Sequence, residues 1–418
     1  MIARIVTWAV EKRWLVLLLT VIVAAIGAFS LYRLPIDAVP DITNNQVQIN
    51  VRAPALSPEL VEKQVSFPIE TALAGTPGLE YTRSLSRNGF AQITAVFSDA
   101  TDIYFARQQV GERLRGVQEN LPDGVNPEMG PIATGLGEVY MYTVRLDHRE
   151  DDKHKPGEPG QQPDGSYITP EGERLTTEED KATYLRTAQD WIVTPLLKNT
   201  PGLAGVDSIG GYAKQFLVVP DVQKLASLGI TLTDLGNALE RNNTSVGGGF
   251  VNRNGEGLAV RSDALVRNAS ELARTVIATR NGVPITVEQV ATVKTGQAIR
   301  MGSASENGTE VVVGTAIMRI GENSRIVSTA VAEKLKTINA SLPPDVVIQP
   351  VLNRTELVNS TIKTVAKNLS EGAVLVIVVL FLLLGNFRAA LIAALVIPIT
   401  MMLTGFGMLR AGVSANLM

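Results

Sequence analysis

The chain has 418 residues, no cysteine, and a formal charge of −3 from 38 basic and 41 acidic side chains. The absence of cysteine excludes disulfides and thiolate metal sites. Residues 36–384 contain 40 acidic against 32 basic side chains, a balance of −8. This balance argues against nucleic-acid binding and mildly favours cationic partners, although an acidic surface usually serves only solubility.

Three apolar runs lie near the two ends of the chain, at 14–31, 372–384 and 389–409. A helix needs roughly 17–25 apolar residues to cross about 30 Å of hydrocarbon, because lipid offers no partner for unpaired backbone groups. The first and third runs are long enough. The middle run is shorter, but an apolar stripe through Leu357, Val365 and Leu369 leads into it. This predicts one continuous helix that leaves an exterior domain and enters the bilayer.

Basic residues beside these runs predict the orientation. Arg4, Lys12 and Arg13 precede the first run, and Arg388 lies in the turn between the other two. Because cytoplasmic flanks carry the excess of Lys and Arg, we expect the N-terminus in the cytoplasm and the large domain outside. Apolar residues at 2, 5, 6, 9 and 10 predict a short helix along the inner surface. The membrane segments are therefore expected at 1–35, 353–386 and 387–418.

A cleaved secretory signal is the alternative interpretation of the first run. The run is long for a signal core of about 7–15 residues, and its small-x-small site at 25–27 lies inside it rather than after it. We therefore favour a retained membrane helix.

The segment 36–136 has the pattern of one α+β unit. Alternation predicts a strand over 46–52, and a helix follows with Ser57 as its cap. Two strands meet at Asn88-Gly89, where both residues tolerate positive φ, and apolar residues from 103 to 121 step by three or four as in a helix. A strand over 138–144 would complete the β-α-β-β-α-β order of a ferredoxin-like unit. The domain boundary that we expect at 136, however, places this strand in the second unit.

The second unit repeats the motifs that end helices in the first. Thr200-Pro201-Gly202-Leu203 ends a helix as Thr76-Pro77-Gly78-Leu79 does, and the motif at 342–346 echoes 121–125. We therefore expect a second, homologous unit at 137–211 and 283–352, interrupted by an insertion at 212–282. The polar segment 146–181 predicts an exposed excursion, and the glycine-rich segment 243–257 predicts a projecting hairpin arm.

Seven motifs carry a resemblance to a known family. They are RLPIDAVPDIT at 33–43, TRSLSR at 82–87, DIYFARQ at 102–108, TGLGEVY at 134–140, GENSR at 321–325, LLGNFR at 383–388 and SANLM at 414–418. They resemble the heavy-metal-efflux branch of the resistance-nodulation-division exporters, especially the cobalt-zinc-cadmium and nickel pumps of Gram-negative bacteria. The resemblance spans nearly the whole chain apart from 146–181.

This resemblance implies an α+β membrane protein with transmembrane helices, two ferredoxin-like porter subdomains and an inserted docking subdomain. It implies a proton-driven antiporter of the bacterial inner membrane, not an enzyme, with no bound cofactor. The transported ion would be divalent, such as zinc, cobalt, cadmium or nickel. The implied partners are further copies in a homotrimer, a periplasmic adaptor and an outer-membrane channel, with the arm at 243–257 contacting a neighbouring protomer.

The chain is shorter than the pumps that it resembles. No Asp or Glu lies inside the three apolar runs, whereas a proton relay requires an ionisable residue within the bilayer. The resemblance implies that the relay acids lie in a fourth helix, beyond residue 418. Alone, the chain is not expected to pump; it is a fragment, a truncated product or half of a split protein.

Two other functions remain open. One is a membrane-anchored periplasmic metal-binding or scaffold protein. The other is an exporter of organic compounds, which the aromatic content of 5% disfavours because drug pockets usually need aromatic walls. Gly247-Gly248-Gly249 lacks the Lys-Ser/Thr of a phosphate loop, so we expect no ATP site.

Three groups of residues are candidate metal ligands. The first is His148, Asp151, Asp152 and His154, since imidazole and carboxylate suit zinc, cobalt or nickel, although the spacing matches no established motif and such loops are usually solvated. The second is Met401, Met402 and Met408, a candidate relay for Cu(I), although methionine in a membrane helix more often serves packing. The third is Glu128-Met129, in a Pro- and Gly-rich segment expected to be a loop where an entrance could form, although with no second ligand nearby a purely structural loop is favoured.

Overall fold

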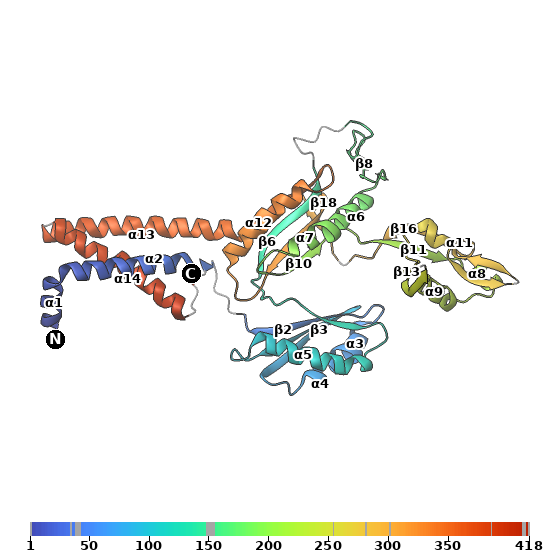
Figure 1. Cartoon of the computed structure of the whole chain (residues 1–418), viewed down its shortest axis with the longest axis horizontal. Helices are drawn as coiled ribbons and strands as arrows, with labels where there is room; N and C mark the ends of the chain where they lie inside the picture. The colour runs from blue at the N-terminus through green and yellow to red at the C-terminus, as the bar shows by residue number, and fades with distance from the viewer. Residues whose placement is uncertain are drawn as a thin grey trace.

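A computed structural model describes residues 2–33, 36–37, 43–147, 155–253, 255–280, 282–300, 302–385, 387–411 and 415–416. Figure 1 shows long helices at one end of the molecule, two sheets with their helices in the middle, and an inserted lobe at the other end. The sheets therefore lie between the apolar helices and the lobe.

The apolar helices agree closely with the expected membrane segments. They are α1 (Ile2–Glu11), α2 (Arg13–Arg33), α13 (Arg354–Leu384) and α14 (Phe387–Ala411). Among the described residues three helices are long and apolar enough to cross a membrane, over Arg13–Leu31, Arg354–Leu383 and Ala394–Ala411. The prediction of one continuous helix through 357–384 is confirmed by α13, which runs unbroken for 31 residues.

The first sheet has the strand order β3-β4-β2-β5. Its elements are β2 (Asn45–Arg52), α3 (Pro58–Val61), α4 (Phe67–Leu73), β3 (Leu79–Arg87), β4 (Phe90–Phe97), α5 (Ile103–Val117), a 3₁₀ turn (Gln118–Asn120) and β5 (Asn126–Met129). Val47, Ile49 and Val51 are fully buried because they share one face of β2 and pack against the helices.

The strand at 138–144 does not complete this sheet, which corrects one prediction. That position is taken by β5, which pairs with β2 from Ile49↔Met129 to Arg52↔Asn126. The strand β6 (Glu138–Leu146) instead pairs with strands of the second sheet, and Val139, Tyr142 and Val144 lie in the second core. Sequence alternation predicts a strand but carries no information on its partner.

The second sheet has the order β10-β18-β6-β19, with the short β17 paired to β18. Its elements are β6, α6 (Glu178–Ala188), α7 (Thr194–Lys198), β10 (Leu203–Ile209), β17 (Ala304–Glu306), β18 (Thr309–Met318), α12 (Ser324–Ala340) and β19 (Val346–Asn353). Both sheets thus place their strands in the spatial order second, third, first, fourth. This shared order supports the predicted duplication.

Both units also contain a π-turn at the same place, just before a proline. The turns cover Glu62–Ser66 and Gln189–Val193. Proline has no N–H to donate to the carbonyl four residues back. Just before Pro68, the Phe67 N–H donates to the carbonyl of Glu62, five residues back, and just before Pro195, the Thr194 N–H donates to that of Gln189. The missing donors therefore account for the widened turns.

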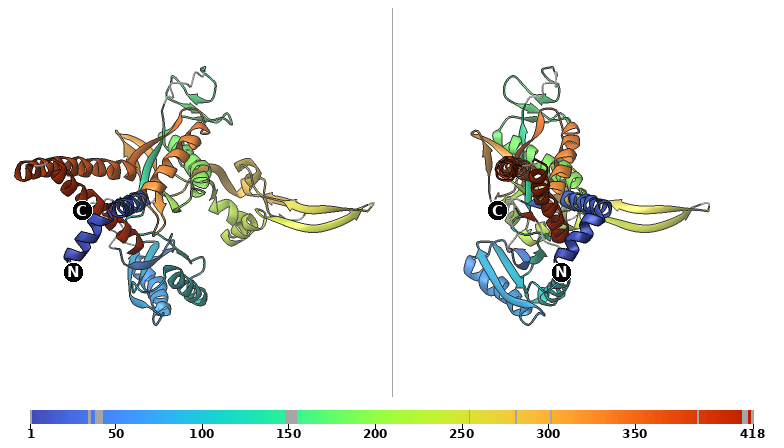
Figure 2. Two further views of the ribbon diagram at one scale, coloured as in Figure 1. Left: turned by 60° about the vertical axis from the view of Figure 1, so that its left-hand side comes forward. Right: turned by 90° about the vertical axis from the view of Figure 1, so that its left-hand side faces the viewer.

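The inserted lobe extends further than 282. The strand β11 (Lys214–Pro220) pairs antiparallel with β16 (Ala291–Gln297), so the lobe ends at Gln297 rather than before residue 283. Between them lie α8 (Val222–Ser227), α9 (Leu232–Arg241), β12 (Ser245–Arg253), β13 (Glu256–Asp263), α10 (Ala269–Ala273), β14 (Val276–Arg280), β15 (Val283–Thr286) and α11 (Val287–Val290). The predicted arm is confirmed as the β12–β13 hairpin, which projects from the lobe in Figure 2.

The excursion at 146–181 is less exposed than expected. Its strands β7 (Gly160–Gln161), β8 (Tyr167–Ile168) and β9 (Arg174–Leu175) form a small sheet. Tyr167 is fully buried in the second core, and its hydroxyl donates to the Pro344 carbonyl at 2.8 Å. One aromatic side chain within a polar segment thus anchors this part of it to the second unit.

The apolar helices α2 and α14 pack closely through two glycines. A Cβ on Gly27 would lie 2.5 Å from the Met402 carbonyl oxygen, and a Cβ on Gly405 would overlap the Leu31 side chain. Small residues let helices approach in this way, which matters in lipid because packing replaces the hydrophobic effect as the attraction between helices. Shortly after α2 and α14 end, β1 (Ile36–Asp37) pairs in parallel with β20 (Ala415–Asn416).

Alanine at Gly27 should destabilise the helix pair most, by about 1–3 kcal/mol, because the added methyl group meets backbone atoms that cannot rotate away. Gly405→Ala should cost less, since the flexible Leu31 side chain can move. Gly407→Ala is the matched control because no atom lies within 4 Å of its Cβ position. Denaturation in sodium dodecyl sulfate, followed by circular dichroism, measures the stability of each variant. Equal stability of the three variants would contradict the prediction.

Candidate functional site

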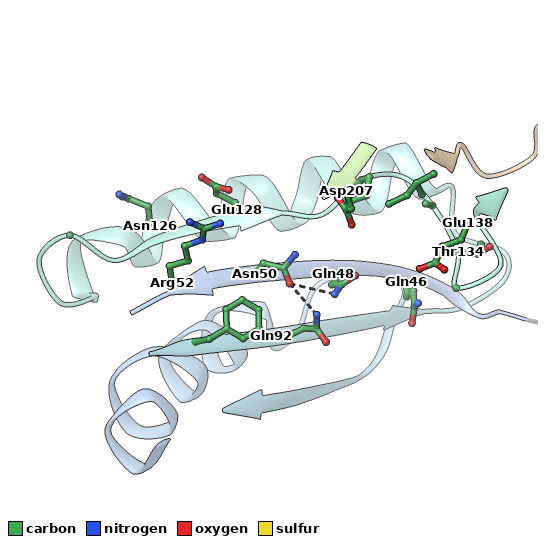
Figure 3. A pocket seen from close by; sticks show the side chains of 16 residues that line it. Gln46, Gln48, Asn50, Arg52, Gln92, Asn126, Glu128, Thr134, Glu138 and Asp207 are labelled. Atoms are coloured by element: carbon green, nitrogen blue, oxygen red, sulfur yellow. Dashed lines mark hydrogen bonds between the residues drawn. The ribbon is translucent and has the colours of Figure 1, made fainter. Parts of the chain in front are cut away.

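A polar cleft of about 790 Å³ lies where the two sheets meet. Figure 3 shows it from close by. Its lining residues are Gln46, Gln48, Asn50, Arg52, Phe90, Gln92, Gly124, Asn126, Glu128, Pro131, Ala133, Thr134, Gly135, Glu138, Asp207 and Ile317. The cleft thus combines strands of the first sheet, the linker 130–137 and strands of the second sheet.

One wall is a row of amides on the polar face of β2. Gln46, Gln48 and Asn50 alternate with the buried valine and isoleucine residues of the same strand, so all three side chains face the cleft. The Asn50 Oδ1 atom accepts hydrogen bonds from Gln48 Nε2 at 3.4 Å and from Gln92 Nε2 at 3.2 Å. The second of these bonds connects β2 to the neighbouring strand β4 along this wall, as Figure 3 shows.

Three carboxylates contribute negative charge to the cleft. Glu128 lies on β5, Glu138 begins β6 and Asp207 lies on β10, and all three residues are exposed. In Figure 3 Asp207 lies across the cleft from the amide row. Arg52 at one end is the single basic residue among the lining residues. The cleft therefore attracts cations and presents carboxylate and amide oxygens, which are ligands for hard divalent ions.

These oxygens do not form a closed metal site. Among the described residues, no group of three or more His, Cys, Asp and Glu side chains could hold a metal ion. Strong binding would need such a group, whereas a passage needs weak contacts that an ion can leave. The arrangement therefore suits transient contact with hydrated cations better than a resident metal.

The linker 130–137 fixes the relative positions of the two walls. The Gly130 N–H donates to the Gln48 carbonyl at 2.8 Å, and the Met318 N–H donates to the Gly137 carbonyl at 2.7 Å. The Arg107 guanidinium on α5 donates to the Gly130 carbonyl at 2.8 Å, and partial burial lowers the pKa of Arg107. The Arg354 guanidinium at the start of α13 donates to the Leu136 carbonyl. The linker thus bonds to both sheets and to an apolar helix.

The predicted ligands His148, Asp151, Asp152 and His154 lie outside the described residues. Of the methionines, Met402 contacts α2 at Gly27, whereas Met401 lines a crevice between α13 and α14. These two neighbours therefore face different helices and do not converge on one site.

The segment of Glu128 and Met129 is a strand rather than the expected loop. Pro127 fits this strand because β5 is at the edge of its sheet, where a missing donor costs little. Alternation points Glu128 into the cleft, while Met129 packs beside Gly111 on α5. The predicted pair therefore contributes one residue to the cleft, the carboxylate.

The amide row was missed at the sequence level although its signal was present. The alternation that predicted a buried face at 47, 49 and 51 also defines an opposite face of Gln, Gln, Asn and Arg from 46 to 52. Such a face ordinarily meets solvent. Only the second sheet, placed across from it, turns this surface into the wall of a cleft.

Comparison with known proteins gives consistent matches along the whole chain. Residues 5–418 match the model of the AcrB/AcrD/AcrF family. The chain is 56% identical over 420 residues to the nickel-cobalt-cadmium resistance protein NccA of Alcaligenes xylosoxydans xylosoxydans. It is 55% identical to the nickel and cobalt resistance protein CnrA, and 49% identical to the cobalt-zinc-cadmium resistance protein CzcA, both of Cupriavidus metallidurans.

These alignments cover 100% of this chain but only 39%, 39% and 37% of the three relatives. A crystal structure of a heavy metal efflux pump superposes with a TM-score of 0.83 at 31% sequence identity, covering 99% of this chain and 38% of that one. The chain therefore spans well under half the length of the proteins that it matches.

Proposed function

This chain belongs to the AcrB/AcrD/AcrF family, and on that premise we propose that it is the N-terminal portion of a proton-driven exporter of divalent heavy-metal cations. The observation that carries this proposal is identity above one half, over the entire chain, with proteins named for resistance to nickel and cobalt. The exporter would reside in the bacterial inner membrane, with α2, α13 and α14 as spans and the sheets in the periplasm.

The two units are then ferredoxin-like porter subdomains, and the lobe from Lys214 to Gln297 is the docking subdomain. Their matching strand order and the cleft between them support this assignment. In the proposed pathway a divalent cation passes between the amide row and the carboxylates of Glu128, Glu138 and Asp207. The exposed carboxylates lower the energy of an entering cation without holding it.

Proton coupling is assigned to a part of the transporter outside residues 1–418. The three apolar runs contain no Asp or Glu, and a carboxylate within the bilayer is the usual proton carrier. This chain would thus supply the metal-handling domain and the helices that connect it to the membrane.

The proposed assembly is a homotrimer with a periplasmic adaptor and an outer-membrane channel. Family membership supports it, and the β12–β13 arm adds a structural reason. Phe250 on this arm is 80% exposed, and Val251, Leu258 and Val260 are also exposed. An apolar arm that projects from its lobe is suited to packing against a neighbouring copy.

Neutralising the cleft should reduce metal tolerance of cells that express the full-length transporter. In water-like surroundings, the electrostatic attraction between a carboxylate and a divalent ion about 8 Å away is about 1 kcal/mol. The triple variant Glu128→Gln, Glu138→Gln, Asp207→Asn loses three such attractions, so the metal concentration at which cells still grow should fall about fivefold or more. Growth on nickel, cobalt, zinc and cadmium measures this. The control Glu333→Gln removes an exposed carboxylate on α12 that pairs with Lys336.

Two results would contradict these proposals separately. Tolerance that is unchanged in the triple variant would exclude the cleft as the route. A wild-type gene that protects against none of the four metals would reject divalent-metal export itself.

Cysteine labelling should place the sheets in the periplasm. The chain has no cysteine, so single substitutions report without background. A membrane-impermeant maleimide should label Asn199→Cys in cells whose outer membrane alone is opened, and should label Glu11→Cys only after the inner membrane is disrupted. Both residues are exposed. The reverse pattern would overturn the orientation.

The segment 148–154 is proposed as an accessory zinc-binding segment, because it holds the only two histidines of the sequence. Residues on both sides of it bond to Asp345: the Asp147 N–H donates to its carbonyl at 2.8 Å, and the Gln161 N–H to its Oδ2 at 2.6 Å. Calorimetry of the full chain with Zn²⁺ should show heat of binding. The double variant His148→Ala, His154→Ala should show none. Unchanged heat in that variant would contradict the proposal.

A further inference from the structure

The short helix α1 meets the long helix α2 at a sharp corner far from the sheets. Figure 1 shows α1 roughly perpendicular to α2, at the same end of the molecule as the turn between α13 and α14, and in the right-hand view of Figure 2 this end faces the viewer. Lys12 closes both helices at the corner, since its N–H donates to the Trp8 carbonyl at 2.9 Å, and its carbonyl accepts from the N–H groups of Leu15 at 2.9 Å and Val16 at 3.1 Å. The corner is therefore a formed structural feature.

Three cations cluster at this corner. Arg4 and Trp8 lie four residues apart on one side of α1, Lys12 lies at the corner itself, and Arg13 begins α2. All four side chains are exposed. None of the three cations forms an ion pair with a carboxylate in the part of the chain that the structure describes. Glu11 is the single acid in this segment, which leaves an excess of positive charge.

Aromatic side chains accompany the cations. Trp8 is 50% exposed and Trp14 is 76% exposed. Tryptophan combines an apolar ring with an N–H donor and is enriched where a membrane meets water. In the sequence of α1, apolar residues recur at 2, 5, 6, 9 and 10, a spacing typical of a helix that lies in the interface.

We propose that this basic corner, formed by Arg4, Trp8, Lys12, Arg13 and Trp14, binds anionic phospholipid headgroups of the inner leaflet in preference to zwitterionic ones. Charge complementarity indicates this ligand, because the three cations have no carboxylate partner among the described residues and attract anions. The adjacent tryptophans and the apolar residues of α1 favour the boundary between headgroups and acyl chains. The proposal uses the membrane placement given above but goes beyond export, because it concerns which lipids surround the protein.

The three tryptophans of the chain allow a direct test. Two belong to the basic corner, and the third, Trp191, is 79% exposed in the second unit. In a Trp191→Phe background, fluorescence reports only the corner. The full chain is reconstituted in vesicles of phosphatidylcholine with a minor fraction of phosphatidylglycerol, with bromine on the acyl chains of one lipid or the other as quencher.

Brominated phosphatidylglycerol should quench the tryptophan fluorescence more strongly than its fraction in the vesicle predicts. The quenching should correspond to an enrichment of phosphatidylglycerol over phosphatidylcholine around the corner of about fivefold or more. Arg4→Gln, Lys12→Gln, Arg13→Gln should abolish this preference while circular dichroism shows unchanged helix content. Arg410→Gln is the matched control, since it removes an exposed cation near the opposite end of α14 and should keep the preference.

Equal quenching by the two lipids, or a preference that survives in the triple variant, would overturn the proposal while leaving the membrane placement intact. The absence of quenching by either lipid would overturn both, because the corner would then lie outside the bilayer. A preference lost equally in Arg410→Gln would also overturn the proposal, since it would show a general charge effect.

Discussion

The linker between β5 and β6 is the constraint on which the middle of the molecule depends. It is short, and its backbone bonds to Gln48 on one sheet and to Met318 on the other. Buried backbone groups must find partners, so each of these bonds restricts where the sheets can lie relative to one another. A longer or unbonded linker would let the two units separate, and the polar faces that line the cleft would then meet only water.

The same linker connects the cleft to the apolar helices. Arg354 begins α13 and donates to the Leu136 carbonyl, so the first residue of the longest helix contacts the segment that sets the width of the cleft. Because Arg354 belongs to α13 itself, a displacement of this helix would act directly on the bond to Leu136. In the proposed transporter, this contact would connect movement of α13 to the proposed site of metal passage.

The candidate passage differs in chemistry from a storage site. The amides of β2 bond to one another and the carboxylates are separate, so an ion meets successive weak contacts instead of a complete coordination sphere. A pump must release what it binds, and weak contacts favour release. The basic corner, at the end of the molecule formed by the apolar helices, carries the opposite charge. The cleft in the middle thus suits cations, and the corner suits the proposed anionic headgroups.

The sequence by itself determined the elements whose signals are local. Apolar length identified the helices α2 and α14, the stripe through Leu357 and Leu369 identified the continuity of α13, and Asn88-Gly89 identified a hairpin, because each depends on neighbours within a few residues. The repeated Thr-Pro-Gly-Leu motif likewise revealed two similar units. The tertiary structure alone decided the partners of β6, the end of the lobe at Gln297, the anchoring of Tyr167 and the cleft lined by Gln48 and Asp207. Those features depend on pairing and packing between residues far apart in the chain, and periodicity contains no information about which distant face a strand or side chain will meet.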